Sequence, residues 1–117
     1  PYWNFETIQK IENTYGVKST FFFICQEYQS NIFKTIYDNK RGARYNITSP
    51  NLVNIIRDLD EKGWEIGVHG SFGSYDNIEL LSNEKNILEK IVGHEIQGIR
   101  QHYLNLSIPL TLSKLTI

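Results

Sequence analysis

The feature that most constrains the fold is an alternation of short apolar runs with longer segments of helical periodicity. Three runs rich in aromatic or β-branched residues predict strands, at Ser19–Cys25, Trp64–Val68 and Glu95–Ile99. The first is apolar almost throughout, which is typical of a strand buried on both faces. Strands that alternate with helices are typical of βαβ units in a mainly parallel sheet or barrel. The sequence therefore predicts an α/β fold of alternating β-α units.

The helical segments carry recognisable start and stop signals. Each expected helix lies between a capping residue and a glycine: Asn4 to Gly16, Ser49-Pro50 to Gly63, and Asp76 or Asn77 to Gly93. Residues 32–37 are expected to form a further short helix, and Pro109 to open another. Apart from the short helix at residues 32–37, helices and strands are expected to alternate along the chain.

Length and charge exclude several classes of protein. The chain of 117 residues allows one domain, and its net charge of −1 offers no electrostatic footprint for nucleic acid. No apolar stretch is long enough to span a bilayer, and the single cysteine, Cys25, excludes an intrachain disulfide and is expected to be a small buried hydrophobe. Because the chain begins at Pro1 and has no Met, we expect residues of the domain to be missing at both ends. The compartment and the oligomeric state are left open.

Polar side chains concentrate in two segments, Gly67–Tyr75 and Arg100–Tyr103, and each segment covers the end of an expected strand. In α/β sheets and barrels, ligand sites gather at the carboxyl ends of the strands. The sequence therefore predicts that His69, His102 and Arg100 converge on one edge of the fold.

Three motifs carry a resemblance to a known family. The segment Gly63–His69 (GWEIGVH) resembles the second motif of the polysaccharide deacetylase, or NodB-homology, family. The segment Tyr15–Phe22 resembles the strand motif that precedes it, and Gly98–Tyr103 is similar to the third motif, usually Arg-x-Pro-Tyr. Their order and spacing agree with the family over nearly the whole chain. Residues 1–117 are accordingly interpreted as a single, partial domain of this type.

The resemblance implies a distorted (β/α) barrel with fewer than eight strands. Members of the family remove N- or O-acetyl groups from sugars in polysaccharides, and thus act as hydrolases, in part on carbon–nitrogen bonds that are not peptide bonds. A divalent metal, commonly zinc, is held by one Asp and two His, and a second Asp is the general base. We therefore expect a metal cofactor and an acetylated polysaccharide substrate.

The family roles transfer to this chain position by position. His69 matches the first metal-binding His, whereas the position of its usual partner, four residues on, is occupied by Gly73. Arg100 matches the Arg that orients the catalytic carboxylate, and Tyr103 the Tyr whose N–H stabilises the oxyanion. His102 stands where the family has Pro, and we hypothesise that it replaces the lost metal ligand.

Substrate contacts are expected from the loop after His69. Phe72 and Tyr75 are candidates for stacking on sugar rings, or alternatively for closing the barrel rim, and Ser71 or Ser74 for a contact to the metal through water. The Asp-rich first motif is expected before Pro1, and the motif with the general-acid His after Ile117. We therefore expect the 117 residues alone to be inactive.

Less specific interpretations stand beside these. His69 and His102 are alternatively structural histidines, Arg100 a partner of Glu65 or Glu95, and His94 a solvated loop residue. The chain is then a catalytically inactive relative that serves as a glycan-binding or scaffolding module. A third possibility is an α/β hydrolase acting on a small amide, because fold does not determine substrate.

Overall fold

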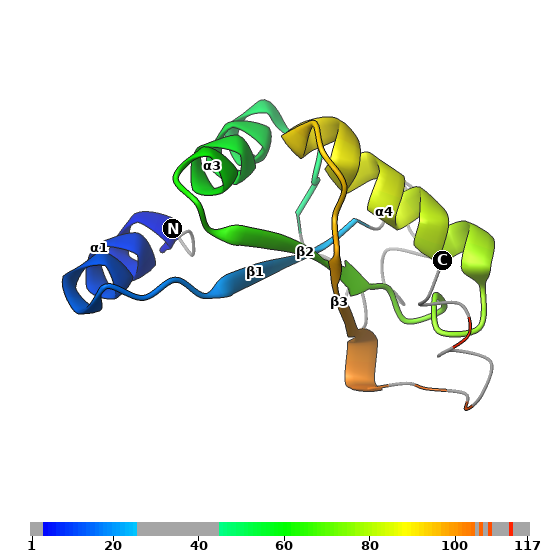
Figure 1. Cartoon of the computed structure of the whole chain (residues 1–117). Coiled ribbons are helices and arrows are strands. Elements are labelled where there is room, and N and C mark those ends of the chain that lie inside the picture. The colour runs from blue at the N-terminus through cyan, green and yellow to red at the C-terminus, as the bar shows by residue number, and fades with distance from the viewer. Residues whose placement is uncertain (1–3, 26–44, 105, 107, 109–112, 114–117) are drawn as a thin grey trace.

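The structure is a computed structural model that describes residues 4–25, 45–104, 106, 108 and 113. Three parallel strands form one sheet in the order β1-β2-β3 (Figure 1). The elements are α1 (Phe5–Tyr15), β1 (Thr20–Ile24), α3 (Pro50–Glu61), β2 (Glu65–Gly70), α4 (Ile78–Val92), β3 (Gly98–Gln101) and the 3-10 turn η1 (His102–Leu104). The predicted α/β class with alternating β-α units is confirmed. The helices expected at residues 32–37 and at Pro109 lie outside the described residues.

The third strand begins later than the sequence predicts. Glu95–Ile99 was the expected strand, but pairing with β2 starts only where Gly98 meets Gly67. The backbone N–H of Ile96 instead donates to the Glu89 carboxylate of α4, at 2.9 Å. This contact occupies the Ile96 N–H, which in a longer β3 would be available for a hydrogen bond to β2.

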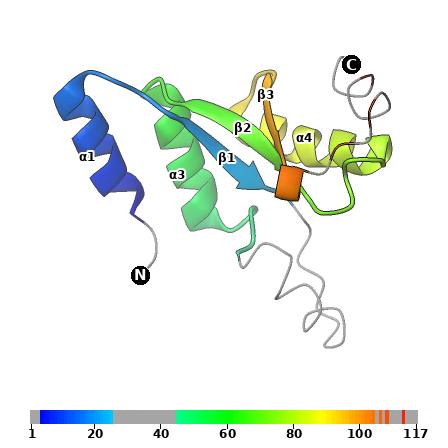
Figure 2. The ribbon, with the colours of Figure 1, turned by 90° about the horizontal axis from the view of Figure 1, so that it is seen from below.

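The three helices pack against one face of the sheet. Side chains alternate between the two faces of a strand, so Phe21 and Phe23 share a face with Ile66 and Val68, their partners in register. This face forms a single buried core with residues of α3 and α4 (Leu52, Ile56, Leu59, Leu81, Leu88 and Ile91). Figure 1 shows α3 and α4 above the sheet, and from below the strands lie in front of both helices (Figure 2).

Helix α1 contacts the same face of the sheet. The ring of Phe5 lies 5.8 Å from the ring of Phe21 and 6.0 Å from that of Phe23, measured between centroids. All three described helices therefore cover the face that points away from His69.

The opposite face of the sheet is only partly covered by the described residues. Thr20, Phe22 and Ile24 of β1 are intermediate in exposure, so the expectation that this strand is buried on both faces is not met within the described part of the chain. The Phe22 ring lies against Gly67, where an added Cβ would sit 2.6 Å from it. His69 and Arg100 are partners in register and share this more open face.

The ends of the helices follow the predicted signals. Gly16 (φ 65°) and Gly93 (φ 83°) take the left-handed conformation after α1 and α4. Asn77 caps α4, and its side-chain oxygen accepts the Leu80 N–H at 3.0 Å. Ser49 precedes Pro50 at the start of α3 as expected, although its side chain makes no capping hydrogen bond. Among the described helices, none has the length and apolar character needed to cross a membrane.

Candidate functional site

The centre of the candidate site is a pair of histidines at the carboxyl edge of the sheet. His69 is the second-last residue of β2, and His102 is the first residue of η1, directly after β3. His69 Nε2 and His102 Nδ1 are 3.1 Å apart, and η1 lies beside the end of β2 (Figures 1 and 2). At this distance one nitrogen donates and the other accepts, so the contact requires at least one neutral ring. The predicted convergence of these two residues is confirmed.

The electrostatic surroundings favour neutral histidine at this position. Burial lowers the pKa of His69, and the neighbouring His102 and Arg100 lower it further. A neutral imidazole has a free lone pair, which is the form that accepts a proton or binds a metal ion. The pair is therefore suited to general-base chemistry or to metal ligation.

Aromatic side chains surround His102. The Tyr103 ring lies 4.4 Å from His102, and the Phe72 ring lies 6.4 Å from His102 and 6.1 Å from Tyr103, all in edge-to-face geometry. Phe72 is 40% exposed and Tyr103 67% exposed. The histidine pair is thus bordered by aromatic surface that is accessible to a ligand.

The backbone after His102 has an uncommon conformation. Tyr103 (φ 54°) and Leu104 (φ 55°) both have positive φ, which L-residues other than glycine adopt rarely. Such conformations concentrate at ligand clamps and active sites, where the surrounding structure maintains them. Here they turn the chain sharply at the point where it leaves the sheet.

Arg100 is exposed and lies opposite His69 in the register. Neither of the ion pairs considered for it is present. The Glu65 carboxylate accepts a hydrogen bond from Thr20, and Glu95 lies 3.4 Å from Lys85. Within the described part of the chain Arg100 forms no ion pair, and its guanidinium adds positive charge to the edge that carries the histidines.

The loop after β2 bonds inward rather than toward solvent. The Ser71 N–H donates to the Glu84 carboxylate at 3.1 Å, and the Ser74 hydroxyl lies 2.8 Å from the Ser71 carbonyl oxygen. Ser71 and Ser74 are buried, whereas Tyr75 is half-buried. At Gly73 the chain is exposed, and an added Cβ would meet only Leu80, at 3.8 Å.

Glu84, whose carboxylate accepts a hydrogen bond from the backbone of this loop, was not identified from the sequence. Its side chain is only 1% exposed, and burial raises its pKa, although its hydrogen bond to Ser71 opposes that shift. A signal for it was present, because Glu84 interrupts the apolar stripe of Leu81, Leu88 and Ile91 on α4. A charged residue at a core position of an amphipathic helix is unusual and calls for a partner.

Cys25 lies near this carboxylate. Burial, together with the charge of Glu84, raises the pKa of the thiol to about 12. The predicted buried cysteine is confirmed, and its raised pKa disfavours the thiolate, which is the reactive form.

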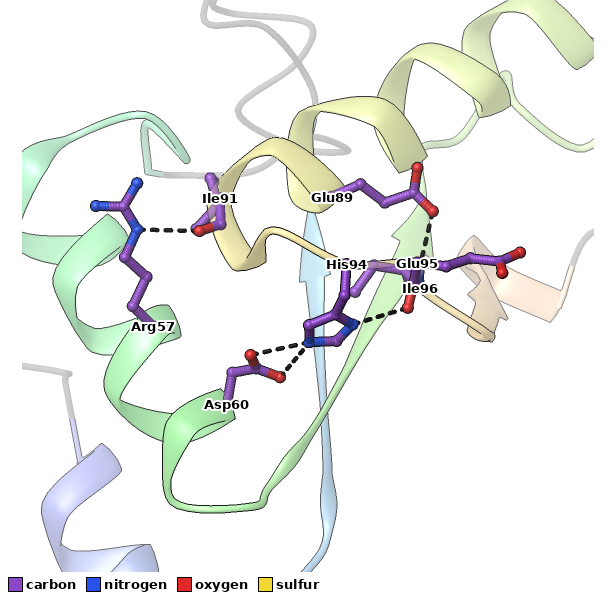
Figure 3. Close-up of polar contacts among 7 residues, drawn as sticks. All are labelled: Arg57, Asp60, Glu89, Ile91, His94, Glu95 and Ile96. Atoms are coloured by element: carbon purple, nitrogen blue, oxygen red, sulfur yellow. Dashed lines mark hydrogen bonds and ion pairs between the residues drawn. The ribbon is translucent and has the colours of Figure 1, made fainter.

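The third histidine, His94, lies in the loop before β3, at the opposite edge of the sheet (Figure 3). Its Nε2 is 2.8 Å from the Asp60 carboxylate, and its Nδ1 is 3.0 Å from the Glu95 carbonyl oxygen. These contacts raise its pKa, the one to Glu95 most strongly. His94 is exposed and in a loop, as predicted, but it links α3 to the start of β3.

The described residues contain only part of a metal site. Within residues 4–25 and 45–104, with 106, 108 and 113, no three His, Cys, Asp or Glu side chains are grouped so that they could hold one ion. His69 and His102 are the two nitrogen donors that lie together.

No family model matches this chain, and neither a curated protein nor a solved structure is significantly similar to it. Its function has to be inferred from the site itself.

Proposed function

We propose that the chain is part of a metal-dependent carbohydrate deacetylase domain, a hydrolase that removes acetyl groups from N- or O-acetylated sugars of a polysaccharide. The observation that carries this proposal is the contact between His69 Nε2 and His102 Nδ1, 3.1 Å apart at the carboxyl edge of a parallel sheet. The motifs GWEIGVH and GIRQHY place these two residues at positions that resemble the second and third motifs of the deacetylase family.

The arrangement of the sheet is compatible with a barrel of the deacetylase type. The strands follow one another in chain order, and the described helices cover a single face. Barrels built from repeated β-α units have this arrangement, as does one half of a doubly wound sheet, so the motifs rather than the sheet favour the barrel. In such a barrel the half-exposed face of Phe22, His69 and Arg100 is the interior, which accounts for an apolar strand with one incompletely buried face.

The histidine pair fits two positions of a zinc site. Two nitrogens about 2.0–2.1 Å from a tetrahedral zinc are about 3.3 Å apart, close to the observed 3.1 Å. The lowered pKa of His69 favours the neutral, ligating form. A divalent ion bound there would polarise the acetyl carbonyl and activate water for attack. The third protein ligand in this proposal is the acidic residue that the family carries in its first motif.

The neighbouring residues have distinct roles in this proposal. Arg100 shares the face of His69 and has no partner carboxylate among the described residues, so it is suited to orient a catalytic carboxylate. The Tyr103 N–H, in a sharply turned backbone, is assigned to stabilise the oxyanion of the attacked acetyl group. Phe72 and Tyr103 present aromatic faces on which a sugar ring stacks, and Tyr75 and Ser71 shape the loop beside them.

A second candidate function is a catalytically inactive relative that binds glycan. Two observations favour it: Gly73 replaces a family ligand, and His69 Nε2 and His102 Nδ1 contact each other directly. The aromatic surface of Phe72 and Tyr103 would then bind sugar with no metal involved.

Release of acetate tests the proposal. We expect the intact protein that contains this chain to release acetate from N-acetylglucosamine oligomers or from an O-acetylated glycan. His69→Ala is expected to abolish most of this activity, because a metal ligand is lost. His94→Ala is the matched control and is expected to retain full activity, since His94 lies at the other edge of the sheet.

Three other outcomes would redirect the assignment. Glycan binding without acetate release would favour the inactive relative. Hydrolysis of a small amide in preference to acetylated sugars would favour the third possibility. Equal activity in His69→Ala and the wild type would contradict the proposed site.

A further inference from the structure

A buried polar network lies beneath the histidine pair. Glu84 of α4 is 1% exposed, and it reaches the loop after β2 rather than solvent. Ser74 is fully buried, Ser71 is 5% exposed and Gln101 8% exposed. Buried polar side chains are costly unless they bond to one another, so a group of four in one place has to be explained.

The contacts in this network link the segment that follows His69 to the residue that precedes His102. The Glu84 carboxylate accepts the N–H of Ser71, two residues after His69. The Ser74 hydroxyl lies 2.8 Å from the Ser71 carbonyl oxygen and 3.2 Å from Gln101 Oε1, and it donates to one of these oxygens at a time. Gln101 immediately precedes His102.

The network packs tightly against the end of β2. A Cβ added at Gly70 would lie 2.3 Å from Gln101 Oε1 and 2.6 Å from Ser74 Oγ. The side chains therefore fill the space directly behind the backbone that carries His69. Gln101 and Ser74 thus bear directly on that backbone, and Glu84 is linked to it through the hydrogen bond from the Ser71 N–H.

We propose that Glu84 is a positioning residue for the His69–His102 pair, acting through Ser71, Ser74 and Gln101 to set the distance between the two ring nitrogens. The proposal rests on the proposed function only in assigning metal ligation to that pair. Residues that orient metal ligands without binding the metal themselves commonly matter for metal affinity, and their loss lowers that affinity about 10–100-fold.

Unsatisfied atoms in the same place support this role. Glu84 Oε1, Gln101 Nε2 and His102 Nε2 are buried and have no hydrogen-bond partner among the described residues. An unpaired buried polar atom costs about 1–3 kcal/mol, so stability alone does not explain why these groups are gathered here. A role in holding the site does explain it.

The experiment compares Glu84→Leu with Glu89→Leu. Glu89 is on the same helix and also accepts a loop N–H, that of Ile96, but at the opposite edge of the sheet. Two properties are measured in the protein: the ¹⁵N chemical shifts of the histidine rings without metal, and the dissociation constant for zinc. Glu84→Gln retains an oxygen that accepts the Ser71 N–H and serves as the conservative rescue.

We expect Glu84→Leu to move the ring-nitrogen shifts of His69 and His102 toward those of isolated histidine and to weaken zinc binding about 10–100-fold. Glu84→Gln is expected to stay within about threefold of the wild type, because it keeps the acceptor. Glu89→Leu should lower thermal stability without altering either property. Unchanged ring shifts in folded Glu84→Leu would overturn the proposal.

Two further measurements apply if Glu84→Leu does not fold or if the wild type binds no zinc. If Glu84→Leu does not fold, Ser74→Ala removes one hydroxyl from the same network and is expected to perturb the ring shifts in the same direction. If the wild type binds no zinc, the metal assignment of the proposed function fails, while the ring shifts of the metal-free protein still decide whether Glu84 positions the pair.

Discussion

The pKa of histidine is shifted in opposite directions at the two edges of the sheet. At the amino edge, His94 faces the Asp60 carboxylate and the Glu95 carbonyl oxygen, both of which accept hydrogen bonds, and its pKa is raised. At the carboxyl edge, a ring nitrogen of His69 faces one of His102, and burial lowers the pKa of His69. The amino edge thus stabilises a charged ring, and the carboxyl edge a neutral one with a usable lone pair.

The carboxylates of α4 show the same division. Glu89 pairs with Lys85 at 3.4 Å and accepts the Ile96 N–H, which ties the helix to the start of β3 (Figure 3). Glu84, five residues earlier, is buried, and one of its oxygens has no hydrogen-bond partner among the described residues. The polar groups named at the amino edge bond to one another, as expected for a structural role. At the carboxyl edge some polar atoms have no such partner in the described part of the chain, and this difference agrees with the site that we propose there.

The largest effect on stability that we predict within the site is that of Gly70→Ala. The added methyl group would overlap the side chains of Gln101 and Ser74, which are both buried, so at least one of them has to shift. Overpacking of this kind typically costs about 1–3 kcal/mol. Chemical denaturation of the purified variant measures this loss in the free energy of unfolding.

Gly73→Ala, in the same loop, is the matched control for Gly70→Ala. Its added methyl group would meet only Leu80 at an ordinary contact distance, so we expect a change of less than about 0.5 kcal/mol. Equal stability of the two variants would show that the carboxyl edge is not packed as described.

A smaller effect is predicted for the pH dependence of stability. The pKa of folded His94 is raised above its ordinary value of 6.5, so its contribution is fully present below pH 6.5 and is lost as pH rises through the folded pKa. The side chain is 54% exposed, so the contribution is at most about 1 kcal/mol. His94→Ala should abolish this decrease in stability with rising pH. Thermal unfolding of the variant and the wild type at several pH values measures the difference.

The His69 ring should titrate in the opposite sense in metal-free protein. Its folded pKa is lowered, so its contribution is present above pH 6.5 and is lost as pH falls toward the folded pKa. NMR titration is expected to give a midpoint above 6.5 for His94 and below 6.5 for His69. The reverse order would break the contrast between the two edges.

The sequence was a good guide to the elements and to the position of the two histidines. Periodicity located β1, β2 and the helices described, because an amphipathic pattern reflects which face is buried. It also placed His69 and His102 on one edge, since the carboxyl ends of parallel strands lie together. Both inferences use only local spacing and one rule of topology.

What the sequence did not predict depends on contacts between distant residues. The start of β3 was misplaced because a side chain of α4, Glu89, takes the N–H of Ile96. Glu84 and Gln101 were overlooked because polarity alone suggests exposure, and their burial follows from packing between α4 and two strand ends. The contact between the histidine rings likewise depends on the turn at Tyr103.

The account is tested most directly by zinc binding of the intact protein that contains this chain, measured by calorimetry and metal content for the wild type, His69→Ala, His102→Ala and His94→Ala. We predict stoichiometric zinc in the wild type and in His94→Ala, and its loss in both variants of the pair. Absence of zinc from the wild type, or binding that survives both His69→Ala and His102→Ala, would contradict a metal site at the carboxyl edge.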